Sequence, residues 1–202
     1  MAETSIQRRG GVSPAEPELA ALALRFARRV HLDQHRKQTH EQFVEHPIRV
    51  AELLADAGYG EAVLAAAYIH DVVEKTTVEL DEIRKRFGPE VARLVEALTD
   101  DPLLSDYAER KRALRRRVLA AGEEAAAIYA ADRVANMRDW RSAPPDVREE
   151  LASRLGTTLA ERIGLWREDL EDLSRLEGEL PFMAELEVGL RELRADLAGQ
   201  AG

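Results

Sequence analysis

Residues 65–77 read AAAYIHDVVEKTT and belong to a longer stretch, GEAVLAAAYIHDVVEK, that is apolar on nearly all sides. A stretch of this kind predicts a helix that is buried at the centre of a fold. It ends in His70 and Asp71, and Glu74 follows four residues after His70, on the same helix face. These polar side chains either close a helix end or supply half of a metal site whose other half lies elsewhere in the chain.

The rest of the chain also favours helices. Its 202 residues are rich in Ala, Leu, Glu and Arg, with 45% hydrophobic and only 5% aromatic residues, and this bias is typical of helical proteins. We find no β-hairpin signal and no long alternating pattern, so we expect an all-α fold. Apolar spacing together with Gly and Pro positions places the expected helices at 13–31, 48–58, 60–75, 78–88, 89–101, 106–122, 123–140, 146–176 and 180–198.

The composition also limits the function. The net charge is −9, whereas proteins with a broad nucleic-acid surface usually carry a basic surplus, so we expect no nucleic-acid partner. The chain has no Cys, which excludes disulfides and thiol nucleophiles. No apolar run approaches the ~20 residues of a membrane span, and the N-terminus has no signal-peptide core. We therefore expect a cytoplasmic protein that binds no membrane.

Four residues form a candidate metal site. His46 precedes Pro47 at a helix start, His70 and Asp71 are adjacent, and Asp132 lies inside a second apolar helix. Aspartate is almost never buried without a partner, and two imidazoles with two carboxylates suit Mn²⁺, Fe²⁺ or Zn²⁺ with positions open to water and substrate. Taken singly, His46 is more often a helix-start residue, and Asp132 could pair with a nearby arginine. Their joint occurrence favours the metal site.

Two further side chains share helix faces with these candidates. Glu74, four residues after His70, is placed to orient or deprotonate a metal-bound water. Asn136 lies four residues after Asp132, so both project from one face. The amide of Asn136 could hold a ribose or phosphate oxygen.

Five stretches together resemble one known family. They read HRKQ at 35–38, HPIRVAELLADAG at 46–58, AAAYIHDVVE at 65–74, TTVELDEIRKRFGPEVARLVEALTDD at 76–101, and ERKR and YAADRVANMRD within 109–139. In this order they resemble the HD-domain hydrolases of the RelA/SpoT type, especially the small stand-alone alarmone hydrolases. The resemblance implies an all-α HD domain, which we place at 13–145. A flexible tail at 1–12 would precede it, and helices at 146–202 would pack on it or mediate a homodimer.

The resemblance also implies a reaction. Members of the family bind one Mn²⁺ and hydrolyse the 3′-pyrophosphate of guanosine tetra- or pentaphosphate, so we expect such an alarmone hydrolase here, with Fe²⁺, Zn²⁺ or Mg²⁺ as other candidate ions. By motif the metal ligands would be His46, His70, Asp71 and Asp132, with Glu74 beside the attacking water. The substrate contacts would be Arg36, Lys37, Lys111, Arg112 and Asn136.

One residue departs from the family pattern. The family usually reads His-Asp-x-x-Glu-Asp, whereas here Lys75 follows Glu74. An ammonium group there could pair with Glu74 and lower its basicity, or contact a phosphate, so Lys75 joins Glu74 among the catalytic candidates. Two alternatives follow: an HD phosphohydrolase for another nucleotide, such as an adenosine alarmone, and a nucleotide-binding sensor with weak turnover.

Overall fold

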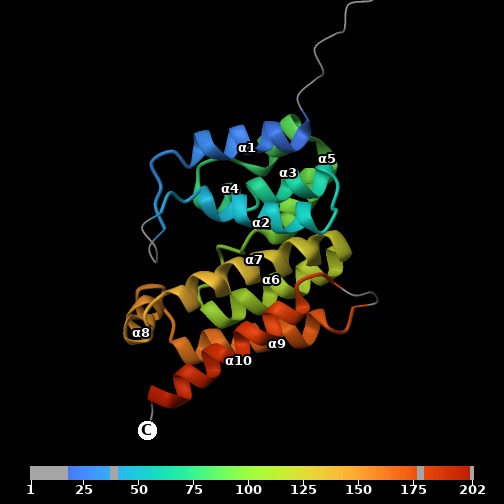
Figure 1. The fold of residues 1–202 in the computed structure, drawn as a ribbon. Helices are drawn as coiled ribbons and strands as arrows, with labels where there is room; N and C mark the ends of the chain where they lie inside the picture. The colour runs from blue at the N-terminus through green and yellow to red at the C-terminus, as the bar shows by residue number, and fades with distance from the viewer. Residues whose placement is uncertain (1–17, 37–40, 177–179, 201–202) are drawn as a thin grey trace, which may run out of the picture.

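The computed structural model describes residues 18–36, 41–176 and 180–200. Within these ranges the regular elements are helices, apart from one isolated antiparallel bridge between His35 and Gln42. The helices are α1 (Leu19–Val30), α2 (Glu45–Asp56), α3 (Glu61–Ile69), α4 (Val72–Lys75), α5 (Leu80–Leu98), α6 (Tyr107–Ala121), α7 (Glu123–Ser142), α8 (Pro145–Arg154), α9 (Leu159–Leu173) and α10 (Met183–Gln200) (Figure 1). The all-α prediction is confirmed. The tail predicted at 1–12 and the helix start predicted at 13 lie outside the described residues.

Helix α7 is the centre of the fold. It contacts α2, α3, α5, α6, α9 and α10, and most of its side chains are buried. Many of these are alanines, so neighbouring backbones can approach closely. Figure 1 shows α1 to α4 on one side of α7, and α6, α9 and α10 on the other. Asp132, which lies on α7, is therefore placed between two groups of helices.

The sequence predicts one helix over 60–75, but the structure has two, α3 and α4, which meet at His70 and Asp71. The ring Nδ1 of His70 donates to the carbonyl oxygen of Ala67 at 2.7 Å. In a continuous helix that oxygen would accept from the N–H of Asp71, and side-chain bonds of this kind compete with the helix ladder. The helix therefore breaks at the point where it holds the His70 ring.

The predicted helix at 146–176 is also divided, into α8 and α9. Gly156 between them has a φ of 73°, a left-handed conformation that commonly ends helices. A capping box then starts α9, because the Thr158 side chain accepts from the N–H of Glu161, and the Glu161 carboxylate accepts from the N–H of Thr158. The prediction of one helix is wrong because these two signals fix a turn.

Gly88 and Pro89 separate two helical segments within α5, as the sequence predicts. Gly88 has a φ of 88° and a ψ of 170°, in a region that is essentially restricted to glycine. Gly88→Ala is therefore expected to lower the free energy of unfolding by about 1–3 kcal/mol, although the added Cβ would meet no atom within 4 Å. Chemical denaturation would measure the change.

Gly164→Ala is the control for this prediction. Gly164 lies inside α9, and a Cβ added there also meets no atom within 4 Å. Alanine should raise the free energy of unfolding by about 0.5–1 kcal/mol, because it has the higher helix propensity. If both substitutions stabilised the protein, the backbone conformation of Gly88 would not disfavour a residue that has a Cβ.

The C-terminal helices pack on the rest of the fold. Helix α9 contacts α6 and α7, and α10 contacts α7 and α9. Trp140 of α7 meets Trp166 of α9 edge to face, with their ring centroids 6.1 Å apart. Residues of α7, α9 and α10 therefore share one hydrophobic core. The domain boundary at 145 stays a prediction.

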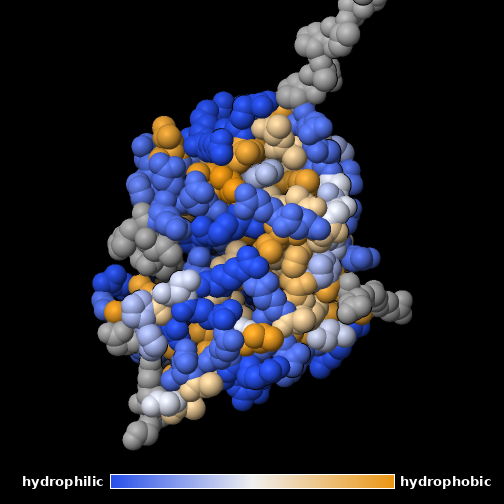
Figure 2. Space-filling view, in the orientation of Figure 1, coloured by the Kyte–Doolittle hydropathy of each residue, from blue (hydrophilic) through white to orange (hydrophobic). Residues whose placement is uncertain are grey.

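The surface in the view of Figure 2 is hydrophilic over most of its area, and hydrophobic residues show as separate patches, many of them in a band just right of the centre. Among the helices described, no stretch is both long enough and apolar enough to cross a bilayer. The homodimer proposed for the C-terminal helices stays a prediction.

Candidate metal and substrate site

A cavity of about 540 Å³ collects most of the predicted site residues. Its walls come from the segment before α2, the first turn of α2, the break between α3 and α4 with α4 itself, the end of α5 and the loop after it, helices α6, α7 and α9, and the turn after α8. The predicted residues that line it are Arg36, His46, His70, Asp71, Glu74, Lys75, Lys111, Asp132 and Asn136. Groups that are far apart in the sequence therefore face one space.

His46, His70 and Asp132 form a compact cluster, with one ligand atom of each within 4.8 Å of the others. The Nε2 of His46 lies 2.8 Å from Oδ1 of Asp132, and the Nε2 of His70 lies 3.8 Å from the same oxygen. Two ligands of one octahedral ion, each about 2.1 Å from it, lie about 3 Å apart when adjacent and about 4 Å apart when opposite. The three groups therefore fit one divalent ion.

The two imidazoles have different proton affinities. Burial lowers the pKa of His46 despite its hydrogen bond with Asp132, so this ring is neutral at neutral pH. Burial would also lower the pKa of His70, but the carboxylates of Asp71 and Asp132 together raise it. Because Nδ1 of His70 is bonded to the Ala67 carbonyl, Nε2 is the nitrogen that can bind a metal.

Asp132 is held at both of its carboxylate oxygens. Its Oδ1 accepts from Nδ2 of Asn136 at 2.8 Å, and its Oδ2 accepts from Nη1 of Arg133 at 3.1 Å. Burial alone would raise the pKa of Asp132, but the hydrogen bond with His46 and the charge of Arg133 bring it well below its usual range. The carboxylate is therefore ionised and oriented, as a metal ligand must be.

Asp71 lies at the edge of the cluster. Its Oδ2 is 3.5 Å from Nε2 of His70, and its side chain lines the cavity. Burial would raise its pKa, but the charges of His70 and Lys75 lower it, so this carboxylate is also ionised at neutral pH. Its part as a fourth metal ligand stays a prediction.

Glu74 and Lys75 form an ion pair on the cavity wall, with 24% of the Glu74 side chain and 40% of the Lys75 side chain exposed. Burial would lower the pKa of Lys75, but the carboxylates of Asp71 and Glu74 raise it, so Lys75 is an ammonium at neutral pH. The pairing is one of the two contacts that the sequence suggests for Lys75. The Glu74 side chain is therefore only partly covered where it lines the cavity.

The predicted substrate contacts that reach the cavity already have protein partners. Nη2 of Arg36 donates to Oδ1 of Asn136 at 3.0 Å, and its Nη1 lies 3.0 Å from Oδ2 of Asp139. Nζ of Lys111 lies 2.6 Å from Oδ2 of Asp100. A phosphate group would therefore have to share or replace some of these contacts.

Arg112 lies outside the cavity lining, and its predicted placement is corrected. Its Nε and Nη2 donate to the Glu168 carboxylate on α9 at 2.9 and 2.7 Å. Adjacent residues on a helix point about 100° apart, so the turn that brings Lys111 to the cavity directs Arg112 away from it. Lys37 lies outside the described residues, and its contact stays a prediction.

Arg162 of α9 lines the cavity but was not predicted from the sequence. It is 9% exposed, donates to the Tyr107 hydroxyl at 2.7 Å, and lies over the rings of Trp140 and Trp166 at 4.8 and 5.4 Å. Its buried Nε has no hydrogen-bond partner among the described residues. A guanidinium with free donors suits a phosphate. An arginine four residues before a tryptophan is too common a pattern to reveal this in a sequence.

The cavity is more cationic than the chain as a whole. Six Lys or Arg residues and four Asp or Glu residues line it, although the net charge of the chain is −9. The three basic residues not named from the sequence are Arg110, Arg133 and Arg162. A divalent ion would add two further positive charges. Such a cavity is suited to a polyanionic ligand.

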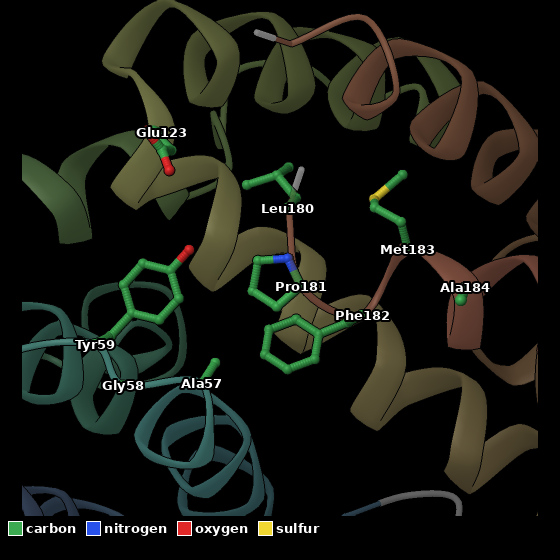
Figure 3. A pocket seen from close by; sticks show the side chains of 9 residues that line it. All are labelled: Ala57, Gly58, Tyr59, Glu123, Leu180, Pro181, Phe182, Met183 and Ala184. Carbon is green, nitrogen blue, oxygen red and sulfur yellow. The ribbon is translucent and has the colours of Figure 1, made fainter. Parts of the chain in front are cut away.

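A second cavity of about 550 Å³ lies between the turn after α2 and the segment that leads into α10. Figure 3 shows Tyr59 on one side of it and Pro181 and Phe182 on the other. It shares no lining residue with the cavity around the His–His–Asp cluster. The candidate active site is therefore the first cavity alone.

The fold and the cluster together define a helical protein whose central helices hold a divalent-metal site. Comparison with known families agrees, because the model of the HD domain matches residues 23–166. The chain belongs to the HD domain family.

Curated relatives point to one kind of enzyme. A probable guanosine-3′,5′-bis(diphosphate) 3′-pyrophosphohydrolase of Synechocystis is 37% identical over 166 residues, which are 77% of this chain and 22% of the relative. The human guanosine-3′,5′-bis(diphosphate) 3′-pyrophosphohydrolase MESH1 is 40% identical over 124 residues, which are 60% of this chain and 69% of the relative. The chain spans under a quarter of the length of the first curated relatives it matches, at 22% and 24%.

A solved structure agrees with the curated relatives. It is described as a metazoan ortholog of SpoT that hydrolyses ppGpp, and it matches with a TM-score of 0.69 at 28% identity. The match covers 90% of this chain and 96% of the other. The arrangement of helices is therefore shared over nearly the whole of both chains.

Proposed function

We propose that the chain is a metal-dependent hydrolase that removes the 3′-pyrophosphate from guanosine tetra- or pentaphosphate. The observation that carries this proposal is the excess of positive charge around the cluster of His46, His70 and Asp132 in an otherwise acidic chain. A guanosine with pyrophosphate groups at both the 5′ and 3′ positions is a polyanion that suits such a cavity. The relatives named as 3′-pyrophosphohydrolases support the same substrate.

We propose Mn²⁺ as the ion, with Fe²⁺, Zn²⁺ and Mg²⁺ as alternatives. Two imidazole nitrogens, the Asp132 carboxylate and, as predicted, the Asp71 carboxylate would hold it, a ligand set that suits such ions. When bound, the ion would polarise a phosphoryl oxygen and lower the pKa of water. The bond from His70 to the Ala67 carbonyl keeps the ring in the orientation that this role needs.

The side chains around the cluster would transfer the proton and bind the phosphate groups. Glu74 is the proposed general base, which takes the proton of the attacking water. Water adds its oxygen to the phosphorus next to the ribose O3′, and the bond from that phosphorus to O3′ breaks. O3′ takes up a proton, and GDP and pyrophosphate leave when the substrate is the tetraphosphate. Arg36, Lys111 and Arg162 would bind phosphate oxygens and so hold the substrate in line.

Product analysis tests this proposal. Protein stripped of metal by a chelator is incubated with guanosine tetraphosphate, with and without added Mn²⁺, and the products are separated by ion-exchange chromatography. We expect GDP and pyrophosphate in equal amounts, formed only after Mn²⁺ is restored. Release of single phosphates, or no turnover with Mn²⁺ present, would contradict the proposal.

Lys75 favours a second candidate function, the hydrolysis of another nucleotide. If its ammonium contacts a phosphate, Lys75→Asp should raise KM for the preferred nucleotide about tenfold or more, since hydrogen bonds to charged groups contribute about 1.5–3 kcal/mol. Steady-state kinetics over a panel of guanosine and adenosine nucleotides would measure this. Lys85→Asp, an exposed position in α5 outside the cavity lining, is the control. Unchanged rates and preference for Lys75→Asp would show that Lys75 is incidental.

A nucleotide-binding sensor is the remaining alternative. It predicts tight equilibrium binding of the nucleotide with no release of phosphate or pyrophosphate in the same sample. The location in the cytoplasm, the lack of nucleic-acid binding and the homodimer stay predictions.

A further inference from the structure

A buried carboxylate of helix α9 is connected to the metal cluster through one arginine. Asp169 is 4% exposed. Its Oδ1 accepts from Nη1 of Arg115 at 2.8 Å and from the Tyr129 hydroxyl at 2.9 Å. Its Oδ2 lies 2.8 Å from Nε of Arg133. Arg133 in turn donates to Oδ2 of Asp132 at 3.1 Å.

Arg133 is therefore fixed from three sides. Asp132 and Asp169 form ion pairs with two different nitrogens of its guanidinium, at 3.1 and 2.8 Å, and its central carbon lies 4.2 Å from the centroid of the Tyr129 ring. The Arg133 side chain is 10% exposed, so water screens its charge weakly. Its contact with Oδ2 of Asp132 leaves Oδ1 directed at His46 and His70.

This arrangement places a buried positive charge beside a cluster that would bind a divalent cation. Without a counter-charge, Arg133 would repel that ion and would compete with it for the Asp132 carboxylate. Asp169 supplies the counter-charge, because it pairs with Arg133 and is not one of the three clustered groups.

We propose that Asp169 is a positioning residue for the metal site, which holds and neutralises Arg133 so that Asp132 presents Oδ1 to the ion. The inference rests on the metal site of the proposed function. It makes the C-terminal helix α9 a part of that site. Residues in such a supporting position typically change metal affinity about 10–100-fold when they are replaced.

Mn²⁺ binding to the metal-stripped protein, measured from the EPR signal of the free ion without nucleotide, tests the proposal. Asp169→Asn should raise the Mn²⁺ dissociation constant about 10–100-fold. Arg115→Gln is the control, because it removes the other ion pair of Asp169, together with the pairs of Arg115 with Glu168 and Asp172, while leaving the contact with Arg133. Both variants should be less stable to heat, but Arg115→Gln should bind Mn²⁺ within about twofold of the wild type.

A double variant tests whether Asp169 acts through Arg133. With Arg133→Gln, the uncompensated charge is gone, so adding Asp169→Asn should change Mn²⁺ affinity by less than about twofold. Additive losses, or an Asp169→Asn protein that binds Mn²⁺ as the wild type does, would overturn the inference. If Asp169→Asn does not fold, Asp169→Ser takes its place in the same comparison.

The outcomes separate this inference from the proposed function. A wild-type protein that binds no Mn²⁺ would overturn both. A wild-type protein that binds Mn²⁺ and hydrolyses guanosine tetraphosphate, beside an Asp169→Asn variant of equal affinity, would overturn the role of Asp169 alone.

Discussion

His70→Ala is expected to abolish the Mn²⁺-stimulated hydrolysis of guanosine tetraphosphate. Nε2 of His70 lies 3.8 Å from Oδ1 of Asp132, and Nδ1 is bonded to the Ala67 carbonyl, so the ring is a fixed part of the cluster. A catalytic metal ion contributes several kcal/mol to transition-state stabilisation, so its loss should lower kcat/KM by about 10³-fold or more. Steady-state kinetics and metal analysis of each purified protein would measure both effects.

His31→Ala is the matched control for this variant. His31 is also buried, at 1% exposed, but its ring packs against Phe43 and its Nδ1 bonds Oε1 of Gln34 at 2.8 Å, outside the metal cluster. The control should lose stability and keep its Mn²⁺. A His70→Ala protein with full activity would show that this cluster does not hold the catalytic ion.

Glu74→Gln is expected to lower kcat about 10²–10⁴-fold, the usual contribution of a general base. Glutamine keeps the size of the side chain but cannot accept the proton. Glu74 lines the cavity without belonging to the group of His46, His70 and Asp132, so the Mn²⁺ content should not change. Steady-state kinetics together with metal analysis separates loss of the base from loss of the ion.

Glu79→Gln serves as the control, since Glu79 is exposed, lies only five residues further along the chain and is outside the cavity lining. It should leave kcat unchanged. If Glu74→Gln lost its Mn²⁺ together with its turnover, Glu74 would be a ligand and not the base. An unchanged kcat would assign the proton transfer to another group.

The sequence predicted the helices well where the burial of a helix can be recognised from its own stretch of residues. The stretch that becomes α2 shows its apolar side directly in the sequence, the stretches that become α3 and α7 show their burial through continuous apolar residues, and Gly88 and Pro89 mark a true interruption. The errors arose at contacts that periodicity does not encode. One is the side-chain bond of His70 to Ala67, and the other is the turn with the left-handed Gly156.

In the candidate site, too, the features set by local spacing could be predicted, whereas those set by packing between helices could not. Asp132 and Asn136 lie four residues apart on α7, so their shared orientation could be predicted. His70 and Glu74 have the same spacing but lie on either side of the break between α3 and α4. The structure nevertheless brings both pairs into one cavity. Arg162 is different, because it reaches the cavity only through the packing of α9 against α6 and α7. Asp169 reaches Arg133 by the same packing. The apolar spacing of α9 marks its inward face, but no local pattern in the sequence indicates that this face meets α6 and α7 beside the cavity.

The most direct test of the account is to locate the metal. Crystals of the protein grown with Mn²⁺ are measured at an X-ray wavelength where manganese scatters anomalously. The account predicts one strong anomalous peak per chain, in contact with Nε2 of His46, Nε2 of His70 and a carboxylate oxygen of Asp132. The account would be contradicted if Mn²⁺ were fully occupied at another site while no peak appeared at these three residues. A peak bound by other residues would also contradict it.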